Sequence, residues 1–467
     1  MAETIEVHPV TRIEGHAKIS LHLDDQGKVA DALFHVQEFR GFEKFCEGTL
    51  AERLPLLTSR VCGICPVTHH LASTKALDNC FGVQITETAK KLRELLMHGQ
   101  YIESHVLSLT VLSLPDLLYP EGGAEQRNLL HLYEAQPNVA RAALKLRAVG
   151  TAICQILGRR PGHPIGSKAG GMVLPLNKQE KDDLLAQINE AKPLLDGFTT
   201  LMREVVSRRS ELFEELGGIQ TAYMGLSRDG ALEFYDGQVK VMGQDGQELL
   251  SFDQEGYFDH VEEKIENWSY MKFPVLKSGE RFRVGPLARI NIADSVPTER
   301  AGKEFAWFRK NFGRPAHKTL LYHYARFVET LFSLERAEEL LNDPAILSED
   351  VQVEVGIRAG KGTGIVEAPR GTLVHSYEID DAGKASKVNL LVATQHNNFG
   401  FNDALKETAA KLINTTEPDE ATLNKLEMVV RAYDPCLSCS THAVGEKRYF
   451  AILIYDAKDQ LIWEYRS

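Results

Sequence analysis

Hydrophobic and polar residues alternate along the first part of the chain. In residues 5–39, apolar side chains recur at nearly every second position on both sides of the sequence DDQG. A period of two is typical of strands with one buried face, and Asp, Gln and Gly between two such runs form a turn. The sequence therefore predicts a strand-rich N-terminus that contains a hairpin.

The pattern then changes to the period of a helix. From about Thr86 to Leu114, apolar residues recur at steps of three and four, and similar patterns occupy about 138–158, 178–216 and 317–342. The last of these ends at the helix-stopping sequence NDP. The Pro- and Gly-rich stretch RRPGHPIGSKAGG, residues 159–171, indicates a loop.

Strand patterns return in the second half of the chain. Hairpins are predicted at about 231–252, around GQDGQE, and at about 351–394, around DDAGKAS, with a further one near the end in LIYDAKDQLIWEY. No internal repeat or flexible linker separates these regions. We therefore expect one α+β body, mainly helical, with a core of long helices and β hairpins at the N-terminus and toward the C-terminus.

Composition narrows the class of protein. The chain has 467 residues, of which 43% are hydrophobic and 25% charged, and its formal net charge is −12. An acidic surface argues against nucleic acid or an anionic membrane as the main partner. No basic segment precedes an apolar one at the N-terminus, and no apolar run reaches the roughly 18–20 residues that span a bilayer. We expect a cytoplasmic protein without direct membrane insertion.

Seven cysteines suggest metal chemistry rather than disulfides. An odd number of thiols in a long cytoplasmic chain does not indicate a disulfide framework. Four of them form two C-x-x-C pairs, Cys62 with Cys65 and Cys436 with Cys439. A histidine follows each pair, His69 after the first and His442 after the second. We call these pairs the first and second clip.

A structural zinc site is the plainest interpretation of two such pairs. Zinc ribbons hold their pairs about 15–20 residues apart, whereas these clips are about 370 residues apart. Closing that loop costs roughly 5 kcal/mol, which a zinc site could offset, so spacing alone does not exclude zinc. The flanking Arg60, Asp434 and Pro435 are not needed by a simple staple, and thiolates also suit nickel and iron.

Both clips and their flanks resemble the metal motifs of nickel–iron hydrogenase large subunits. The motifs that carry this resemblance are RVCGICPVTH (60–69), DPCLSCSTH (434–442), PVTRIEGH (9–16), FRGFEKF (39–45), HP (163–164) with GG (170–171), GPLAR (285–289) and EAPRG (367–371). They extend over nearly the whole chain. The second clip and FRVGPLARIN resemble the cytoplasmic, bidirectional members, the NAD-linked or viologen- and heterodisulfide-linked group.

The resemblance implies a fold and an activity. The fold would be that of hydrogenase large subunits, which complex-I-like subunits share, with β hairpins near the C-terminal active-site region. The activity would be reversible heterolytic cleavage of dihydrogen into protons and electrons. Cys62, Cys65, Cys436 and Cys439 would hold nickel, and Cys65 and Cys439 would also bridge to an iron ion that carries carbon monoxide and cyanide.

The resemblance also assigns roles to single residues near the clips. Glu14 of TRIEGH would relay protons, with Cys436 as the first acceptor, and Arg370 would face the open metal position and the cyanides. Further residues implied around the metals are His69, Pro369, Thr394 and Asp434. Taken alone, Glu14 is an exposed strand carboxylate, Arg370 a member of a surface ion pair and His69 a core histidine.

A second metal site is implied near the C-terminus. Glu43 and His442 match ligands of a magnesium or iron ion, and the backbone carbonyl of Leu390 would be the third ligand. Carboxylate and carbonyl oxygens are ligands that magnesium prefers. Cys46, Cys80 and Cys154 match no ligand position, so we expect them to be small core side chains.

The resemblance further implies partners and processing. No additional cysteine cluster could carry electrons away, so we expect an iron–sulfur small subunit together with diaphorase, ferredoxin- or heterodisulfide-linked electron-transfer subunits. Residues 1–442 would form the catalytic domain, and a maturation endopeptidase would remove the extension 443–467. Two alternatives stay open: a non-catalytic complex-I-like subunit, whose relatives have lost the clips, and a zinc-stapled scaffold.

Overall fold

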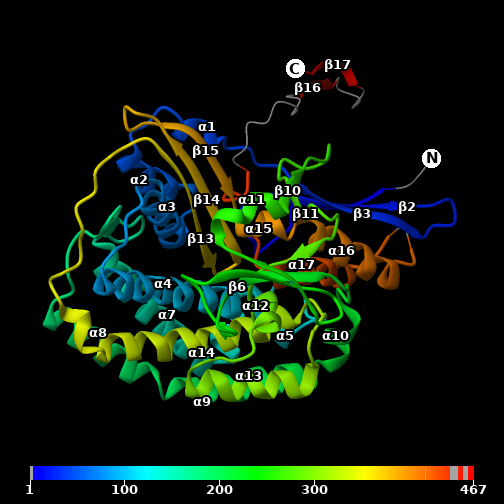
Figure 1. Cartoon of the computed structure of the whole chain (residues 1–467). Coiled ribbons are helices and arrows are strands. Elements are labelled where there is room, and N and C mark those ends of the chain that lie inside the picture. Colours follow the sequence, from blue (N-terminus) through cyan, green and yellow to red (C-terminus); the bar gives the residue numbers. More distant parts are fainter. Residues whose placement is uncertain (1–3, 416, 442–450, 456–460, 467) are drawn as a thin grey trace.

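Long helices form the body of the molecule. The computed structural model describes residues 4–415, 417–441, 451–455 and 461–466. Helix α4 (Glu87–Leu107) packs against α7 (Pro137–Gly158) and α14 (Leu321–Asn342), and α13 (Glu299–Phe312) covers α14 from outside (Figure 1). Thr86 caps α4 by accepting a hydrogen bond from the amide of Ala89. The predicted segment 86–114 is therefore helical, and it continues through a π-helical turn, Ser108–Ser113, into α5 (Leu114–Leu118).

The predicted helical region 178–216 consists of three helices. These are α8 (Lys178–Ala191), α9 (Leu194–Arg208) and α10 (Ser210–Glu215). The break between the first two falls at Pro193, which cannot donate a backbone hydrogen bond in a helix interior. Asn177 and Glu180 form a capping box at the start of α8.

The N-terminal strands form a three-stranded antiparallel sheet in the order β1 (Thr4–Val7), β2 (Ala17–Leu23) and β3 (Val29–Val36). Asp24 stabilises the turn between β2 and β3, because its carboxylate accepts hydrogen bonds from the amides of Gln26 and Lys28. Helix α16 (Asn398–Leu412) packs on β3, where the rings of Phe34 and Phe401 lie 5.0 Å apart. The loop between β1 and β2 contains the TRIEG sequence.

A second antiparallel sheet lies beside the first clip. It consists of β13 (Gly360–Ala368), β14 (Gly371–Ile379) and β15 (Ala385–Leu391), and helix α3 (Pro66–Phe81) crosses β13 and β14. Glycines at alternate positions of β13 make this approach possible. A Cβ atom on Gly364 would lie 2.4 Å from the carbonyl oxygen of Ala72 and from the amide nitrogen of Ala76.

Further elements complete the body. A sheet in the order β12-β6-β8-β9, with β7 paired to β6, packs against α12, and β10 pairs with β11. The bounds of these and the remaining elements are β4 (Ser167–Lys168), β5 (Gly171–Met172), β6 (Ala222–Arg228), β7 (Ala231–Leu232), β8 (Gln238–Met242), β9 (Glu248–Phe252), β10 (Val261–Lys264), β11 (Phe273–Leu276), β12 (Phe282–Arg283), β16 (Ala451–Tyr455), β17 (Leu461–Arg466), α1 (Phe42–Cys46), α2 (Leu54–Thr58), α6 (Leu129–Ala135), α11 (Tyr257–His260), α12 (Pro286–Ile292), α15 (Ala393–His396) and α17 (Glu420–Tyr433), with 3-10 turns at Ala51–Arg53, Ser59–Val61, Gln254–Gly256 and Pro344–Leu347.

One large hydrophobic core unites residues from both ends of the chain. Ile19 and Phe34 of the N-terminal sheet, Leu96 of α4 and Val430 of α17 belong to the same buried cluster. The expectation of a mainly helical α+β body is confirmed. Among the described residues, no helix is both long and apolar enough to cross a bilayer.

Candidate metal centre

The first clip lies where a short turn meets a long helix. Cys62 ends the 3-10 turn Ser59–Val61, and Cys65 is the N-cap residue of α3. Pro66 occupies the first helical position, where a missing amide proton costs nothing. The amides of Ile64 and Cys65 point at the sulfur of Cys62, at 3.2 and 3.3 Å. The positive end of α3 and these two amides favour thiolates at this place.

The second clip follows the end of α17. Asp434 terminates this helix with a left-handed backbone conformation, φ 56°. The turn directs the chain alongside the TRIEG loop, where the amide of Leu437 donates to the carbonyl of Glu14 at 3.1 Å. Cys436 and Glu14 form an isolated parallel bridge. The N-terminal loop therefore holds the second clip in place.

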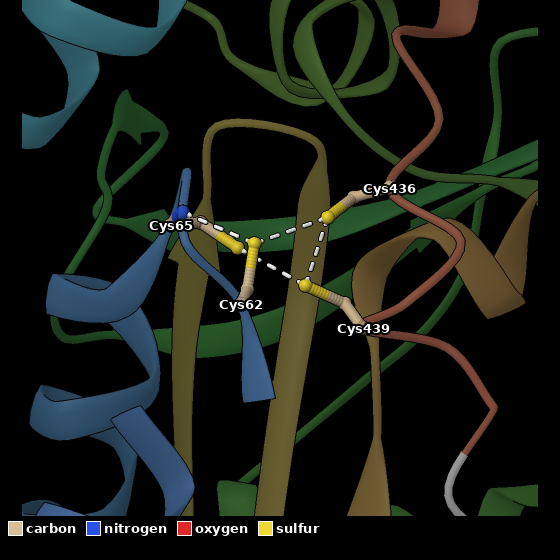
Figure 2. Close-up of side chains that lie close together, drawn as sticks. All are labelled: Cys62, Cys65, Cys436 and Cys439. Atoms are coloured by element: carbon tan, nitrogen blue, oxygen red, sulfur yellow. Dashed lines mark hydrogen bonds between the residues drawn. The ribbon is translucent and has the colours of Figure 1, made fainter. Parts of the chain in front are cut away.

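The two clips meet in the protein interior. Figure 2 shows the four sulfurs pointing toward one another from two segments of opposite ends of the chain. Cys62 Sγ lies 3.2 Å from Cys436 Sγ, Cys65 Sγ lies 3.3 Å from Cys439 Sγ, and all four sulfurs lie within 4.8 Å of one another. None of the four side chains is more than 5% exposed. Four sulfur donors at this spacing form a soft, enclosed metal site.

The four buried sulfurs need a cation between them when they are ionised. Hydrogen bonds from the neighbouring cysteines hold the pKa of Cys65 well below its usual value, whereas burial raises the pKa values of Cys436 and Cys439 well above theirs. Four buried thiolates repel one another unless a counter-charge lies among them. A divalent ion would supply that charge and deprotonate all four sulfurs, so the donor set fits a thiophilic metal.

A small cavity opens beside the sulfurs. Its wall combines apolar side chains with a few polar groups, and its lining residues are Cys65, His69, Ala368, Pro369, Arg370, Leu373, Val392, Ala393, Thr394, Cys436 and Cys439. The hydroxyl of Thr394 accepts a hydrogen bond from the amide of Cys436 at 3.0 Å. Most predicted residues of the site therefore share one enclosed space.

Arg370 is fixed in this wall by the second clip. Its Nε donates to the carbonyl of Asp434 at 2.7 Å, and its terminal nitrogen donates to the carboxylate at 3.1 Å. Burial lowers the pKa of Arg370, but the charges of Asp434 and the cysteines outweigh burial and raise it well above its usual value. The guanidinium is therefore permanently charged, although its side chain is only 4% exposed.

A second buried arginine shapes the turn that carries Arg370. Arg289 of the GPLAR motif donates to the carbonyls of Ala368 and Pro369 at 3.0 and 3.1 Å. It also pairs with Glu329 at 2.6 Å and with Glu367 at 2.7 Å. Two of the sequence motifs, GPLAR and EAPRG, thus meet in one ion-pair network behind the cavity.

Comparisons with known proteins agree with this geometry. A model described as nickel-dependent hydrogenase matches residues 40–118 and 224–442, and a HoxL-like model matches residues 4–39. The chain belongs to the nickel-dependent hydrogenase family. It is 41% identical to one component of the F420-non-reducing hydrogenase vhc of Methanococcus voltae, over 95% of this chain and 96% of the relative. It is 36% identical to the beta subunit of the NAD-reducing hydrogenase HoxS of Cupriavidus necator, over 99% of both chains.

Solved structures give the same result for the fold. The crystal structure of an NAD+-reducing [NiFe]-hydrogenase in the H2-reduced state superposes with a TM-score of 0.91 at 36% identity, covering 94% of this chain and 99% of that chain. The resemblance to nickel–iron hydrogenase large subunits is thus confirmed, and the chain is an oxidoreductase that acts on hydrogen. Neither the complex-I-like subunit nor the zinc-stapled scaffold is needed to explain the clips.

Glu14 of the hydrogenase faces the second clip, but its carboxylate contacts a residue that the sequence did not single out. The amide of Ser438 donates to this carboxylate at 3.1 Å, and the hydroxyl of Ser438 also hydrogen-bonds it. Ser438 lies between the two cysteines of the second clip. The serine between the two cysteines was the sequence signal that could have pointed to this contact, because a purely structural metal site needs no hydroxyl there.

Glu43, on α1, does not line the cavity at the sulfurs but lies beside the end of β15. Its carboxylate accepts a hydrogen bond from the amide of Leu390 at 2.8 Å. Burial raises the pKa of Glu43 to about 7, against the lowering effects of Lys272 and of the Leu390 amide. Glu43 therefore lies beside the backbone of Leu390, while His442 lies outside the described residues.

The remaining cysteines of the hydrogenase are not part of the cluster. Cys46 and Cys80 are buried, and burial raises the pKa of each to about 12. Cys154 is intermediate in exposure and lines a separate pocket with Gly63, Gln100 and Ser104. The expectation of core side chains therefore describes Cys46 and Cys80 better than Cys154.

Proposed function

We propose that this chain is the catalytic subunit of a nickel–iron hydrogenase that cleaves dihydrogen reversibly into protons and electrons. One observation carries the proposal: the sulfurs of Cys62, Cys65, Cys436 and Cys439 converge in an enclosed site. Two relatives that are named as hydrogenases, one F420-non-reducing and one NAD-reducing, extend over almost the whole chain and support it.

All four cysteines would hold nickel, and Cys65 and Cys439 would also bridge to iron. When bound, the nickel–iron centre supplies the Lewis-acidic, redox-active atoms at which dihydrogen is split heterolytically. The iron, with its carbon monoxide and cyanide ligands, would lie in the cavity that Cys65 and Cys439 line.

The cavity wall would orient these ligands and exclude water. Arg370 offers a fixed positive charge to an anionic ligand such as cyanide. Thr394 already accepts a hydrogen bond from the Cys436 amide, so its own O–H can donate to a second anionic ligand. Pro369 and Ala393 add apolar surface, and Asp434 anchors the Arg370 side chain.

Proton transfer would begin at the sulfur of Cys436 and continue to the carboxylate of Glu14. The parallel bridge between the backbones of these residues brings the second clip and the TRIEG loop side by side. Ser438 holds the carboxylate by its amide and hydroxyl, so Glu14 is oriented before a proton arrives. A carboxylate in this position acts as a general base.

A second ion, magnesium or iron, would bind to Glu43, to the carbonyl of Leu390 and to His442. The contact between Glu43 and the Leu390 amide supports this site, because the carboxylate already lies beside that backbone. A cation would also favour the charged form of Glu43, whose pKa is raised by burial.

Electrons would leave through partner subunits. We expect an iron–sulfur small subunit, with a diaphorase, ferredoxin- or heterodisulfide-linked module beyond it in the cytoplasm. Residues 443–467 would be removed by a maturation endopeptidase after nickel insertion, leaving 1–442 as the catalytic domain. The relative named as an NAD-reducing hydrogenase supports a soluble electron acceptor of this kind.

The decisive experiment measures nickel and activity together. We expect about one nickel ion per chain in the purified complex and hydrogen-dependent reduction of viologen. Cys65→Ser should abolish both, whereas Cys154→Ser, outside the cluster, should retain both. Zinc in place of nickel in an active preparation, or full activity of Cys65→Ser, would contradict the proposal.

A further inference from the structure

A buried glutamine of α4 reaches the turn that carries the first clip. Gln100 is only 1% exposed, although its side chain ends in a hydrogen-bonding amide. Burying such an amide without partners costs free energy, so its partners are informative. Both of them are backbone groups at the first clip, the carbonyl of Ile64 and the amide of Val67.

The side-chain amide of Gln100 has one orientation that satisfies both contacts. Its Nε2 donates to the carbonyl of Ile64 at 2.9 Å, and its Oε1 accepts from the backbone amide of Val67 at 3.2 Å. Exchanging the nitrogen and the oxygen would place two acceptors together at Ile64 and two donors together at Val67. The side chain is therefore fixed between the two groups.

The contact with Val67 provides a cap that the first clip does not give to α3. Cys65 occupies the N-cap position, but its side chain makes no capping hydrogen bond. Val67 is the second residue of the helix, where a backbone amide has no partner inside the helix. Gln100 supplies that partner from α4, and the sulfur of Cys65 remains directed at the other cysteines.

The contact with Ile64 acts on a sulfur of the first clip. The carbonyl of Ile64 and the amide of Cys65 belong to one trans peptide unit, in which the two groups point in opposite directions. The amide of Cys65 donates to Cys62 Sγ at 3.3 Å. Holding the carbonyl toward Gln100 thus directs the amide proton toward this sulfur. Hydrogen bonds in such a chain also polarise one another, which strengthens the bond to the sulfur.

A second amide at the same sulfur serves as an internal reference. The amide of Ile64 donates to Cys62 Sγ at 3.2 Å. This amide belongs to the preceding peptide unit, whose carbonyl is that of Gly63 and not the one that Gln100 holds. Loss of the Gln100 contact should therefore weaken one of the two hydrogen bonds at Cys62 and spare the other.

We propose that Gln100 is a positioning residue that orients the Ile64–Cys65 peptide, so that its N–H donates to the Cys62 thiolate. Hydrogen bonds to a ligating sulfur tune the electron density at the metal. Gln100 therefore acts on the metal centre through a ligand and not by contact with the metals. The inference rests on the proposed function, in which Cys62 holds nickel.

The hydrogen bonds at Cys62 can be measured without the complete nickel–iron centre. The full-length chain, labelled with ¹⁵N in isoleucine and cysteine, would be loaded with ¹¹³Cd²⁺, a soft ion with a nuclear spin that thiolates bind. Scalar coupling between ¹¹³Cd and an amide proton reports a hydrogen bond from that amide to a ligating sulfur. We expect coupled signals from Ile64 and Cys65. Absence of the Cys65 coupling in the wild-type chain would overturn the proposal, whatever the variants do.

Gln100→Met and Gln100→Glu test the cause. Methionine keeps the length of the side chain but makes neither hydrogen bond, whereas glutamate can still accept from Val67 but has no proton for Ile64 at neutral pH. Both variants should lose the Cys65 coupling and keep the Ile64 coupling. An unchanged Cys65 coupling would refute the proposal. Loss of both couplings would refute it as well, because Gln100 would then hold the whole turn and not one peptide.

Gln254→Met is the matched control. Gln254 also holds two backbone groups, because its Nε2 donates to the carbonyl of Gly237 and its Oε1 accepts from the amide of Ile365, both at 3.2 Å. These groups lie outside the clips, so both couplings at Cys62 should persist. Loss of the Cys65 coupling in this control would show that the effect does not come from Gln100.

The assembled enzyme gives a second readout. Loss of a hydrogen bond leaves more electron density on the sulfur and on nickel, so Gln100→Met should shift the nickel-centred reduction potential to more negative values, and Gln254→Met should not. An unchanged potential in Gln100→Met would contradict the inference. A chain that binds no nickel but loses the Cys65 coupling in Gln100→Met would refute the proposed function while supporting the role of Gln100.

Discussion

At the scale of single residues, the proposed proton relay depends on Glu14, which backbone amides of the second clip hold in place. The carbonyl of Glu14 accepts from the amide of Leu437, and its carboxylate accepts from the amide of Ser438. These two contacts fix the residue both at its backbone and at the end of its side chain. Such fixation keeps a general base within reach of its proton, which is the first requirement for its role.

Replacing Glu14 by Gln should therefore separate proton transfer from metal binding. Glutamine can keep the contacts with Ser438 but cannot take up a proton at neutral pH. We expect nickel content to stay near one per chain, while the exchange of deuterium from D2 with water falls by at least about 10²-fold, the usual contribution of general acid–base catalysis. Mass spectrometry of the evolved gas measures this exchange.

Glu38→Gln is the matched control. Glu38 lies beside the same loop and pairs with His16 at 2.7 Å, so its carboxylate is directed at the loop rather than at the sulfurs. It should exchange at the wild-type rate. Normal exchange in Glu14→Gln would remove this carboxylate from the relay, and loss of nickel would assign it a structural role instead.

At the scale of elements, the close approach of α3 to β13 explains why the first clip faces the cavity. Gly360, Gly362 and Gly364 point toward α3, and a Cβ atom at each would come within 2.5 Å of its backbone. The helix can therefore lie directly on the strand. Because Cys65 begins this helix, the glycines also set the depth of the first clip.

Gly364→Ala should displace α3 and lower stability. The added methyl meets backbone atoms of Ala72 and Ala76, which cannot rotate away. Overpacking of this kind costs about 1–3 kcal/mol. We expect a lower urea midpoint and reduced nickel content. The control Gly197→Ala lies in helix α9 with no atom within 4 Å of the new methyl, so it should be neutral or stabilising by up to about 1 kcal/mol. Equal midpoints for the two variants would disprove the packing argument.

A charge cluster around Lys75 of α3 leads to a prediction about how the stability of the fold depends on pH. Asp236 pairs with Lys90 at 2.5 Å and with Lys75, on α3, at 3.3 Å. Burial raises its pKa, but Lys75 and Lys90 outweigh burial and lower it to about 2. A depressed carboxyl pKa stabilises the fold above the unfolded value of about 3.9, and this contribution is lost as pH falls toward 2.

Asp236→Asn should therefore destabilise the chain at pH 7 by about 2 kcal/mol, since each pKa unit corresponds to about 1.4 kcal/mol. The difference from wild type should shrink between about pH 4 and pH 2. Urea denaturation at a series of pH values measures this difference, with the exposed Asp381→Asn as a surface control. A difference that stays constant down to pH 2 would show that Asp236 is not the group responsible.

At the scale of the whole molecule, the sequence predicted what local patterns and motifs encode. The long helices followed from their apolar period, and the four cysteines that meet in the interior followed from the two clips. The contact of Glu14 with Ser438 and the hydrogen bonds from His69 through His375 to Tyr377 could not be predicted, because they join segments up to 424 residues apart in the sequence. The alternation of His375 and Tyr377 places both on one face of β14, but nothing in the sequence shows that α3 presents His69 to that face.

The meeting of the two clips, which lie far apart in the sequence, also leads to a prediction about the C-terminal extension, residues 443–467. Thr441 is buried, and its carbonyl accepts a hydrogen bond from the amide of Arg40 at 2.9 Å, so the chain is held up to the end of the second clip. Nickel can bridge the clips only when Cys436 and Cys439 reach Cys62 and Cys65. We therefore expect cleavage after His442 to depend on this closure, which links metal loading to the removal of 25 residues.

Intact-mass spectrometry tests this link. The large subunit of the active complex should lack residues 443–467, whereas a Cys436→Ser chain expressed alongside it should keep Ser467, because its clips never close on nickel. Cys80→Ser, a buried cysteine outside the cluster, should be cleaved like wild type. An active complex with an intact Ser467, or a cleaved Cys436→Ser chain, would show that metal loading at the clips does not control the terminus.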